Sequence, residues 1–192
     1  MGAPATGSLT IRRYPDPILR ATAQPITTFG DPLRQLVDRM FVTMREDGGV
    51  GLAAPQVGVS QRLFITDHHA GREDLPPAPR VWINPRFERC EGTVLNEEGC
   101  LSLPGLYANV ERAARFDVVY QDPDGAEQRI HLDFEAGEFL AIVVQHEYDH
   151  LEGRLFIDHL SHGQLAMLRR KLKELEKAFK KQAGTRGAVL RR

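Results

Sequence analysis

The sequence His-Glu-Tyr-Asp-His at 146–150 restricts the possible folds of this 192-residue chain more than any other feature. It follows a run of apolar residues with no polar face, which predicts a helix buried at the centre of the protein, from about Gly137 to Leu151. His146 and His150 lie one above the other on such a helix, and Glu147 lies one step round it. Buried imidazoles beside acidic groups are costly without an ion. The segment therefore predicts a metal site, with Glu147 reaching a water on the ion.

A catalytic metal usually has three protein ligands and one open position, and the histidine pair supplies two of them. The residues after His150 do not match the longer zinc-protease signature, which adds a glycine and a further histidine at fixed spacing. Upstream, Cys100 stands in the segment Glu-Gly-Cys-Leu-Ser at 98–102 and could offer a thiolate. From these residues alone two interpretations stay open, a third metal ligand or a buried structural thiol.

A third segment, Gly-Val-Gly-Leu-Ala-Ala-Pro-Gln-Val-Gly at 49–58, is rich in glycine and small residues. Such residues allow a second backbone to approach closely. The segment lacks the Lys-Ser/Thr ending of a phosphate-binding loop, which argues against nucleotide binding. The amide of Gln56 could donate to a developing oxyanion, or Gln56 could be an ordinary surface turn residue. Both interpretations remain open at this point.

The rest of the chain predicts a mixed α+β fold in a single domain. Asp31 as the N-cap, followed by proline, opens a helix that the run Asp47-Gly48-Gly49 ends. A polar, proline-rich segment at 68–80 is expected to be a surface loop. Strands are predicted at Arg62–Thr66, Val81–Asn84, Phe116–Gln121 and Gln128–Phe134, the last two joined as a hairpin by Asp-Pro-Asp-Gly.

The last helix has an unusual charge distribution. Ser161 and Gln164 have the spacing of a capping box, and a narrow leucine stripe follows them. Residues 169–192 hold ten Lys and Arg against two Glu, a net charge of +8, so the formal charge of −1 for the whole chain leaves −9 on the other 168 residues. We therefore divide the chain into a catalytic body, 1–168, and a basic C-terminal helix or tail, 169–192, that extends from the same domain.

Composition excludes several classes of protein. A near-neutral charge argues against a wholly basic DNA-binding protein, and no apolar run approaches the roughly 18 residues of a membrane span. Two cysteines are too few for a disulfide framework and fit a reducing compartment. We therefore expect a cytoplasmic protein that binds neither DNA nor a membrane.

Taken together, the segments at 49–58, 98–102 and 145–150 resemble the three signature motifs of the peptide deformylases. Their order and separations agree with that family, and the similarity extends from about Tyr14 to Ser161. The resemblance implies removal of the formyl group from N-formylmethionine at the start of new polypeptides. It also implies antiparallel sheets around a central HExxH-bearing helix, with an N-terminal helix and a basic C-terminal helix.

The resemblance assigns chemical roles to the motif residues. It makes Cys100 the third metal ligand beside His146 and His150. It implies Fe²⁺ as the native ion, although the ligand set would accept Zn²⁺, Ni²⁺ or Co²⁺. It also implies that Glu147 takes a proton from the water and passes it to the leaving amine. Asp149 is expected to be structural or to orient a ligand histidine.

The resemblance also implies how the substrate binds. The Gln56 amide and the Leu101 backbone N–H would stabilise the oxyanion, and an ion pair between Glu98 and Arg112 would brace the Cys100 turn. The residues that match the family's peptide contacts are Val50, Gly51 and Gly99, which pair with the peptide backbone, and Val50, Phe139, Ile142 and Val143, which line the methionine pocket. Asn96 and Tyr107 depart from common family residues, so preference beyond methionine is undefined.

Two other functions compete with this one. The first is a zinc endopeptidase that uses HExxH on ordinary peptide bonds, and the second is a non-catalytic metal-binding or ribosome-binding module. A ribosome contact is also expected for the proposed enzyme, because its C-terminal helix would turn basic residues to RNA phosphates. The leucine stripe of that helix would then pack on the domain or in a ribosomal groove. We expect a bacterial cytoplasm as the setting, with organelles also compatible.

Overall fold

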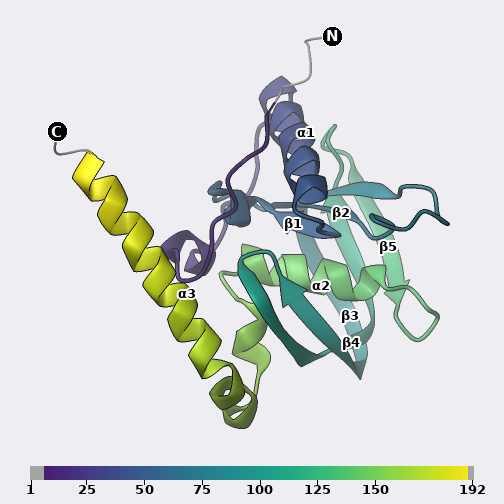
Figure 1. Ribbon diagram of the computed structural model, residues 1–192. Coiled ribbons are helices and arrows are strands. Elements are labelled where there is room, and N and C mark those ends of the chain that lie inside the picture. Colours follow the sequence, from purple (N-terminus) through teal and green to yellow (C-terminus); the bar gives the residue numbers. More distant parts are fainter. Residues whose placement is uncertain (1–6, 190–192) are drawn as a thin grey trace.

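The computed structural model describes residues 7–189, which form one antiparallel sheet and three α-helices (Figure 1). The sheet has five strands in sequential order, so each strand pairs with its neighbour along the chain. The strands are β1 (Gly51–Ala53), β2 (Leu63–Asp67), β3 (Pro79–Cys100), β4 (Leu103–Gln121) and β5 (Glu127–Asp133). The predicted mixed α+β architecture is confirmed.

The hairpin of β3 and β4 is much longer than the sequence predicts. Its apolar parts were expected as the short strands Val81–Asn84 and Phe116–Gln121, but the two strands span 22 and 19 residues. Register shifts near Ile83 and Glu88 interrupt the pairing, and Asn84 and Arg89 have positive φ. These irregularities and the exposed polar residues remove the alternation that identifies a strand. Regular alternation returns at 94–100, where even-numbered residues are half-buried or buried and odd-numbered residues are exposed.

The three α-helices are α1 (Asp31–Glu46), α2 (Leu140–Leu151) and α3 (His162–Val189). Single 3-10 turns lie at Pro17–Arg20 (η1), Ala54–Val57 (η2) and Phe156–His159 (η3). The prediction of Asp31 as the N-cap of α1 is wrong, because Gly30 holds that position and Asp31 is already helical. Helix α2 begins three residues after the predicted Gly137, whose φ of 92° is not helical.

Helix α2 is the buried central helix that its apolar run predicts. Every one of its residues is buried except Tyr148, which is half-buried. Ala141, Val144 and Leu151 pack in one cluster with Trp82 and Phe116 of the sheet. The helix therefore packs on the sheet through one side, and its two histidines lie on a buried helix.

Helix α3 runs along the outside of the β4 side of the molecule (Figure 1). The Ser161 capping box is present, since Ser161 N donates to Gln164 Oε1 at 2.9 Å and Ser161 Oγ accepts from Gln164 N at 3.3 Å. The leucine stripe packs on the domain itself, against a cluster that includes Leu103 and Leu106. The residues of the stripe that pack there are Leu165, Leu168, Leu172 and Leu175. Across residues 7–189, none of the helices is both long and apolar enough to cross a membrane.

Candidate metal centre and active site

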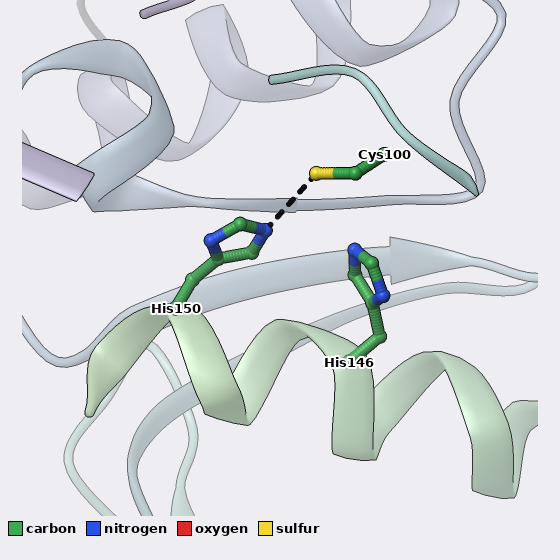
Figure 2. Close-up of side chains that lie close together, drawn as sticks. All are labelled: Cys100, His146 and His150. Atoms are coloured by element: carbon green, nitrogen blue, oxygen red, sulfur yellow. Dashed lines mark hydrogen bonds between the residues drawn. The ribbon is translucent and has the colours of Figure 1, made fainter. Parts of the chain in front are cut away.

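Three potential metal ligands meet between α2 and the end of β3. His146 and His150 lie one turn apart on α2 and point toward Cys100 (Figure 2). The Sγ of Cys100 lies 3.3 Å from Nε2 of His150, and one ligand atom from each of the three residues lies within 4.8 Å of the others. The helix period brings the histidines together, and the hairpin brings the cysteine to them from 50 residues earlier in the chain.

A buried carboxylate fixes the orientation of the first histidine. Glu98 Oε2 lies 2.8 Å from Nδ1 of His146, so this ring presents Nε2 to the ligand group. Glu98 also accepts two hydrogen bonds from Arg112, from Nε at 2.7 Å and from Nη2 at 2.9 Å. The ion pair between Glu98 and Arg112 is therefore present as expected. Such a carboxylate holds one tautomer and one ring orientation.

Asp149 occupies the other end of the same cluster. Its Oδ2 accepts from Arg112 Nη1 at 2.6 Å and lies 2.8 Å from Nε2 of His159. Asp149 therefore holds Arg112 rather than a ligand histidine, and Glu98 is the carboxylate that orients His146. The sequence carried no signal for His159, which reaches Asp149 from η3 across ten residues of chain.

Hydrogen bonds and nearby positive charges favour the ionised forms of the buried acidic groups in this cluster. Burial alone would raise the pKa of Glu98, but hydrogen bonds from Arg112 and His146 lower that pKa to about 2. Burial likewise opposes ionisation of Asp149, and the hydrogen bond from His159 and the charge of Arg112 lower its pKa to about 2. Burial would raise the pKa of the Cys100 thiol, but the two imidazoles lower it well below its usual value. The cysteine is thus poised as a thiolate ligand.

Glu147 lies on the cavity side of α2, beside β1. A Cβ added to Gly51 would lie 2.4 Å from Glu147 Oε1, so glycine is the residue that leaves room for this carboxylate. Within the described residues, its Oε2 is buried and has no hydrogen-bond partner. Burial raises the pKa of Glu147 to about 7, against the lowering effect of the imidazoles. A carboxylate in this state can accept and return a proton near neutral pH.

Gln56 is a buried site residue, so its interpretation as a surface turn residue is wrong. It lies in η2 and is 1% exposed. Its Oε1 accepts from the Ala53 backbone N–H at 2.8 Å, which fixes the amide so that Nε2 points into the site. Nε2 lies 3.2 Å from Ser102 Oγ and 3.5 Å from Cys100 Sγ. A neutral donor is therefore held next to the ligand group.

One cavity of about 470 Å³ opens onto the ligand group. Leu101 lines it from the two-residue turn between β3 and β4, immediately after Cys100. Apart from His150, which is 1% exposed, every site residue expected from the sequence lines this cavity. The others that line it are Val50, Gly51, Gln56, Gly99, Cys100, Phe139, Ile142, Val143, His146 and Glu147.

The donor set suits a divalent transition metal. One thiolate and two imidazoles are the ligands that Zn²⁺ and Fe²⁺ accept in proteins, and three protein ligands leave a position open for water. The unpartnered Oε2 of Glu147 is the acceptor that such a water would meet. Cys100, His146 and His150 therefore fit a divalent transition-metal ion.

Known proteins are similar to this chain in sequence and in fold. The family described as Polypeptide deformylase matches residues 8–166. A peptide deformylase of Mesorhizobium japonicum is 46% identical over 164 residues, covering 85% of this chain and 90% of the relative. One of Hydrogenovibrio crunogenus is 45% identical over 153 residues, covering 80% and 86%. The crystal structure of a plant peptide deformylase has a TM-score of 0.85 at 38% identity, covering 92% of this chain and 93% of that one.

Proposed function

Because the chain belongs to the peptide deformylase family, we propose that it hydrolyses the formamide bond of N-formylmethionyl polypeptides and releases formate. The observation that carries the proposal is the juxtaposition of Cys100, His146 and His150 with the unpartnered carboxylate oxygen of Glu147 in one cavity. This combination is the minimum that metal-assisted hydrolysis requires, namely three ligands, an open position and a base.

In this proposal the three ligands hold one divalent ion, natively Fe²⁺, with Zn²⁺, Ni²⁺ or Co²⁺ as alternatives. The ion, when bound, acts as a Lewis acid that lowers the pKa of water toward neutrality. Glu147 accepts the proton of the attacking water at Oε2 and returns it to the amine that leaves. Its raised pKa supports both steps, since the same group must act as a base and then as an acid.

The oxyanion that forms on the formyl oxygen needs donors that are already in place. We assign this role to the Nε2 amide of Gln56 and the backbone N–H of Leu101. Gln56 is supported by its fixed amide, because Ala53 already holds its Oε1. The loss of one such donor costs about 10²- to 10³-fold in rate.

The peptide is proposed to bind in the cavity as an added strand that pairs with the backbones of Val50, Gly51 and Gly99. Val50 and Gly51 line the cavity at the start of β1, and Gly99 lines it near the end of β3. The methionine side chain enters the apolar part of the cavity, lined by Val50, Phe139, Ile142 and Val143. Ile142 and Val143 are buried on α2 as well, so one helix serves both the core and the pocket.

Formate release tests the proposal directly. The metal-loaded protein is incubated with formyl-Met-Ala-Ser and with the same peptide lacking the formyl group. We expect formate from the first and no cleavage of the second. Cleavage of internal bonds in the unformylated peptide would instead establish an endopeptidase.

Two variants separate an enzyme from a metal-binding module. Glu147→Ala should keep one ion per chain, measured by elemental analysis, and lose turnover by about 10²- to 10⁴-fold. Cys100→Ser should lose the ion, because a hydroxyl is a poor replacement for a thiolate ligand. Full turnover by the Glu147 variant would contradict the proposed proton transfer.

We also propose that α3 contacts ribosomal RNA and that the catalytic unit, 1–168, works in the cytoplasm with residues 169–192 as its basic extension. The leucine stripe is already packed on the domain, so the basic face is the part of the helix left for a partner. Exposed members of that face are Arg169, Arg170, Lys173, Lys177 and Lys180. The side chains of Arg186, Arg191 and Arg192 lie outside the described residues.

Charge reversal tests this contact without disturbing the core. The triple variant Arg170→Glu, Lys173→Glu and Lys177→Glu should weaken salt-sensitive cosedimentation with ribosomes, because fewer phosphates are neutralised. Turnover of formyl-Met-Ala-Ser should stay unchanged. Equal ribosome binding by the variant and the parent would show that the basic face serves only solubility.

A further inference from the structure

A second groove adjoins the active-site cavity. It has a volume of about 630 Å³ and lies between the N-terminal segment and the turn of α3 at 179–182. Arg13 and Asp47 line both hollows, so the groove continues from the mouth of the cavity rather than opening elsewhere on the surface. Phe179, Lys181 and Gln182 form its wall on α3.

The N-terminal segment joins this groove firmly to the catalytic residues. The Arg12 backbone N–H donates to the Gln56 carbonyl at 2.7 Å, and the Tyr14 N–H donates to the Ser102 carbonyl at 2.9 Å. The Tyr14 hydroxyl then donates to Glu176 Oε1 of α3 at 3.2 Å. The backbone on both sides of Arg13 is therefore anchored to the segments that carry Gln56 and Ser102.

Arg13 differs from its neighbour in what its charge contacts. Arg12 lies 3.8 Å from Asp16, and this pair is local to the segment. Arg13 is exposed, and within residues 7–182 its guanidinium makes no hydrogen bond or ion pair. An unpaired guanidinium offers five N–H donors, and at the outlet of a peptide-binding cavity these suit carbonyl and carboxylate oxygens.

We propose that the residues of the substrate that follow the formylmethionine lie in this groove, and that Arg13 favours an acidic side chain at the position facing it. The inference rests on the proposed function, because it extends the path of the same peptide. The occupant follows from continuity, since Arg13 and Asp47 line both hollows and a chain that leaves the first cavity on their side enters the groove. The groove then places the emerging polypeptide against α3.

A charge scan along the substrate tests the proposal. Octapeptides of the form formyl-Met-Ala followed by serines carry a single Glu or a single Lys at each of positions three to eight. The kcat/KM of the metal-loaded enzyme should favour Glu over Lys about two- to fivefold at one or two adjacent positions, the size of an exposed ion pair. Arg13→Glu should reverse that preference at the same positions.

Arg154→Glu is the matched control, because Arg154 is also exposed and lines neither hollow while the change in net charge is the same. It should keep the parent preference at every position. A preference that both variants change equally would reflect net charge and would overturn the proposal.

Cross-linking gives an independent measurement. An octapeptide with a benzoyl-phenylalanine at position six is bound to the metal-loaded Glu147→Gln variant and irradiated. Adducts within residues 10–16 or 179–182 support the groove, and adducts confined to other surfaces overturn it. Absence of formate from every peptide with the parent enzyme would overturn the proposed function itself, whereas formate release without any positional charge preference would overturn only the groove.

Discussion

Two arginine–carboxylate clusters in this protein have nearly the same geometry and opposite surroundings. Arg112 donates to Glu98 and Asp149 at 2.6–2.9 Å, and the side chains of Arg112 and Glu98 are only 4% and 3% exposed. Arg72 donates to Asp74 at 2.8 and 2.9 Å, and those side chains are 59% and 64% exposed. Distance alone therefore does not distinguish the two.

The difference shows what burial does to an ion pair. Water solvates the Arg72 charges whether or not they meet, so their pairing adds little. The Arg112 cluster is buried from water, so each charge depends on the others, and removing Arg112 leaves two buried carboxylates without their arginine. The buried cluster also touches a proposed metal ligand through Glu98, which links the stability of the fold to the orientation of His146.

The largest effect on stability is expected from Arg112→Ala. Removing one partner of a buried ion pair costs about 3–5 kcal/mol, so the free energy of unfolding should fall by that amount. Urea unfolding followed by circular dichroism measures it. Arg112→Lys should recover only part of the loss, because an ammonium cannot donate through a planar fork to two carboxylates. A loss below 1 kcal/mol for Arg112→Ala would place the buried cluster in the same class as the surface pair.

The next effect concerns catalysis rather than folding. In Gly51→Ala the new Cβ would meet Glu147 Oε1 at 2.4 Å, so the carboxylate must move. A displacement of about 1 Å in a catalytic group can cost about 10²-fold, and kcat for formyl-Met-Ala-Ser should fall by that order. Steady-state formate release measures it, with metal content checked in the same sample.

Gly163→Ala is the matched control for the glycine substitution. Gly163 lies in the first turn of α3, and the nearest atom to an added Cβ is Ser161 Oγ at 4.0 Å. Alanine in a helix is favoured over glycine by about 0.5–1 kcal/mol, so this variant should be slightly more stable and fully active. Equal losses of activity in both variants would rule out displacement of Glu147 as the cause.

The smallest effect is expected from Arg72→Ala. Exposed ion pairs contribute about 0–1 kcal/mol, and the free energy of unfolding should change within that range. The same urea experiment used for Arg112 provides the comparison. A loss of 3 kcal/mol here would mean that geometry, rather than burial, sets the strength of these pairs.

The sequence predicted what local periodicity determines. The spacing of His146 and His150, the apolar run before them and the Ser161 capping box all act within a few residues, and the structure contains each arrangement. The contacts that cross the fold could not be obtained in this way. Cys100 remained undecided between ligand and structural thiol until the family resemblance was considered, and the link from Asp149 to His159 had no sequence signal.

One local prediction failed and one alternative that the sequence left open was excluded, both for identifiable reasons. Asp31 and Gly30 are both suitable N-cap residues, and the chain conformation at Gly30 decides between them. A glutamine is an ordinary residue in a surface turn. Gln56 is instead buried, and the N-terminal segment lies against it, since the Arg12 backbone N–H donates to the Gln56 carbonyl. A local sequence pattern covers only a few neighbouring residues, and neither outcome can be predicted from those residues alone.

The alternation at the end of β3 has a practical consequence for protein engineering. Glu98 and Cys100 face inward, while Leu95 and Glu97 face solvent, and Glu97 still lines the mouth of the cavity. A mutant library at Glu97 would change the side chain at the edge of the cavity and leave the buried cluster unchanged. A side chain at Gly99 would displace the Tyr107 ring, because an added Cβ would lie 2.5 Å from it. Along β3, the exposed Glu97, which is suited to substitution, therefore lies next to Glu98, which belongs to the buried cluster.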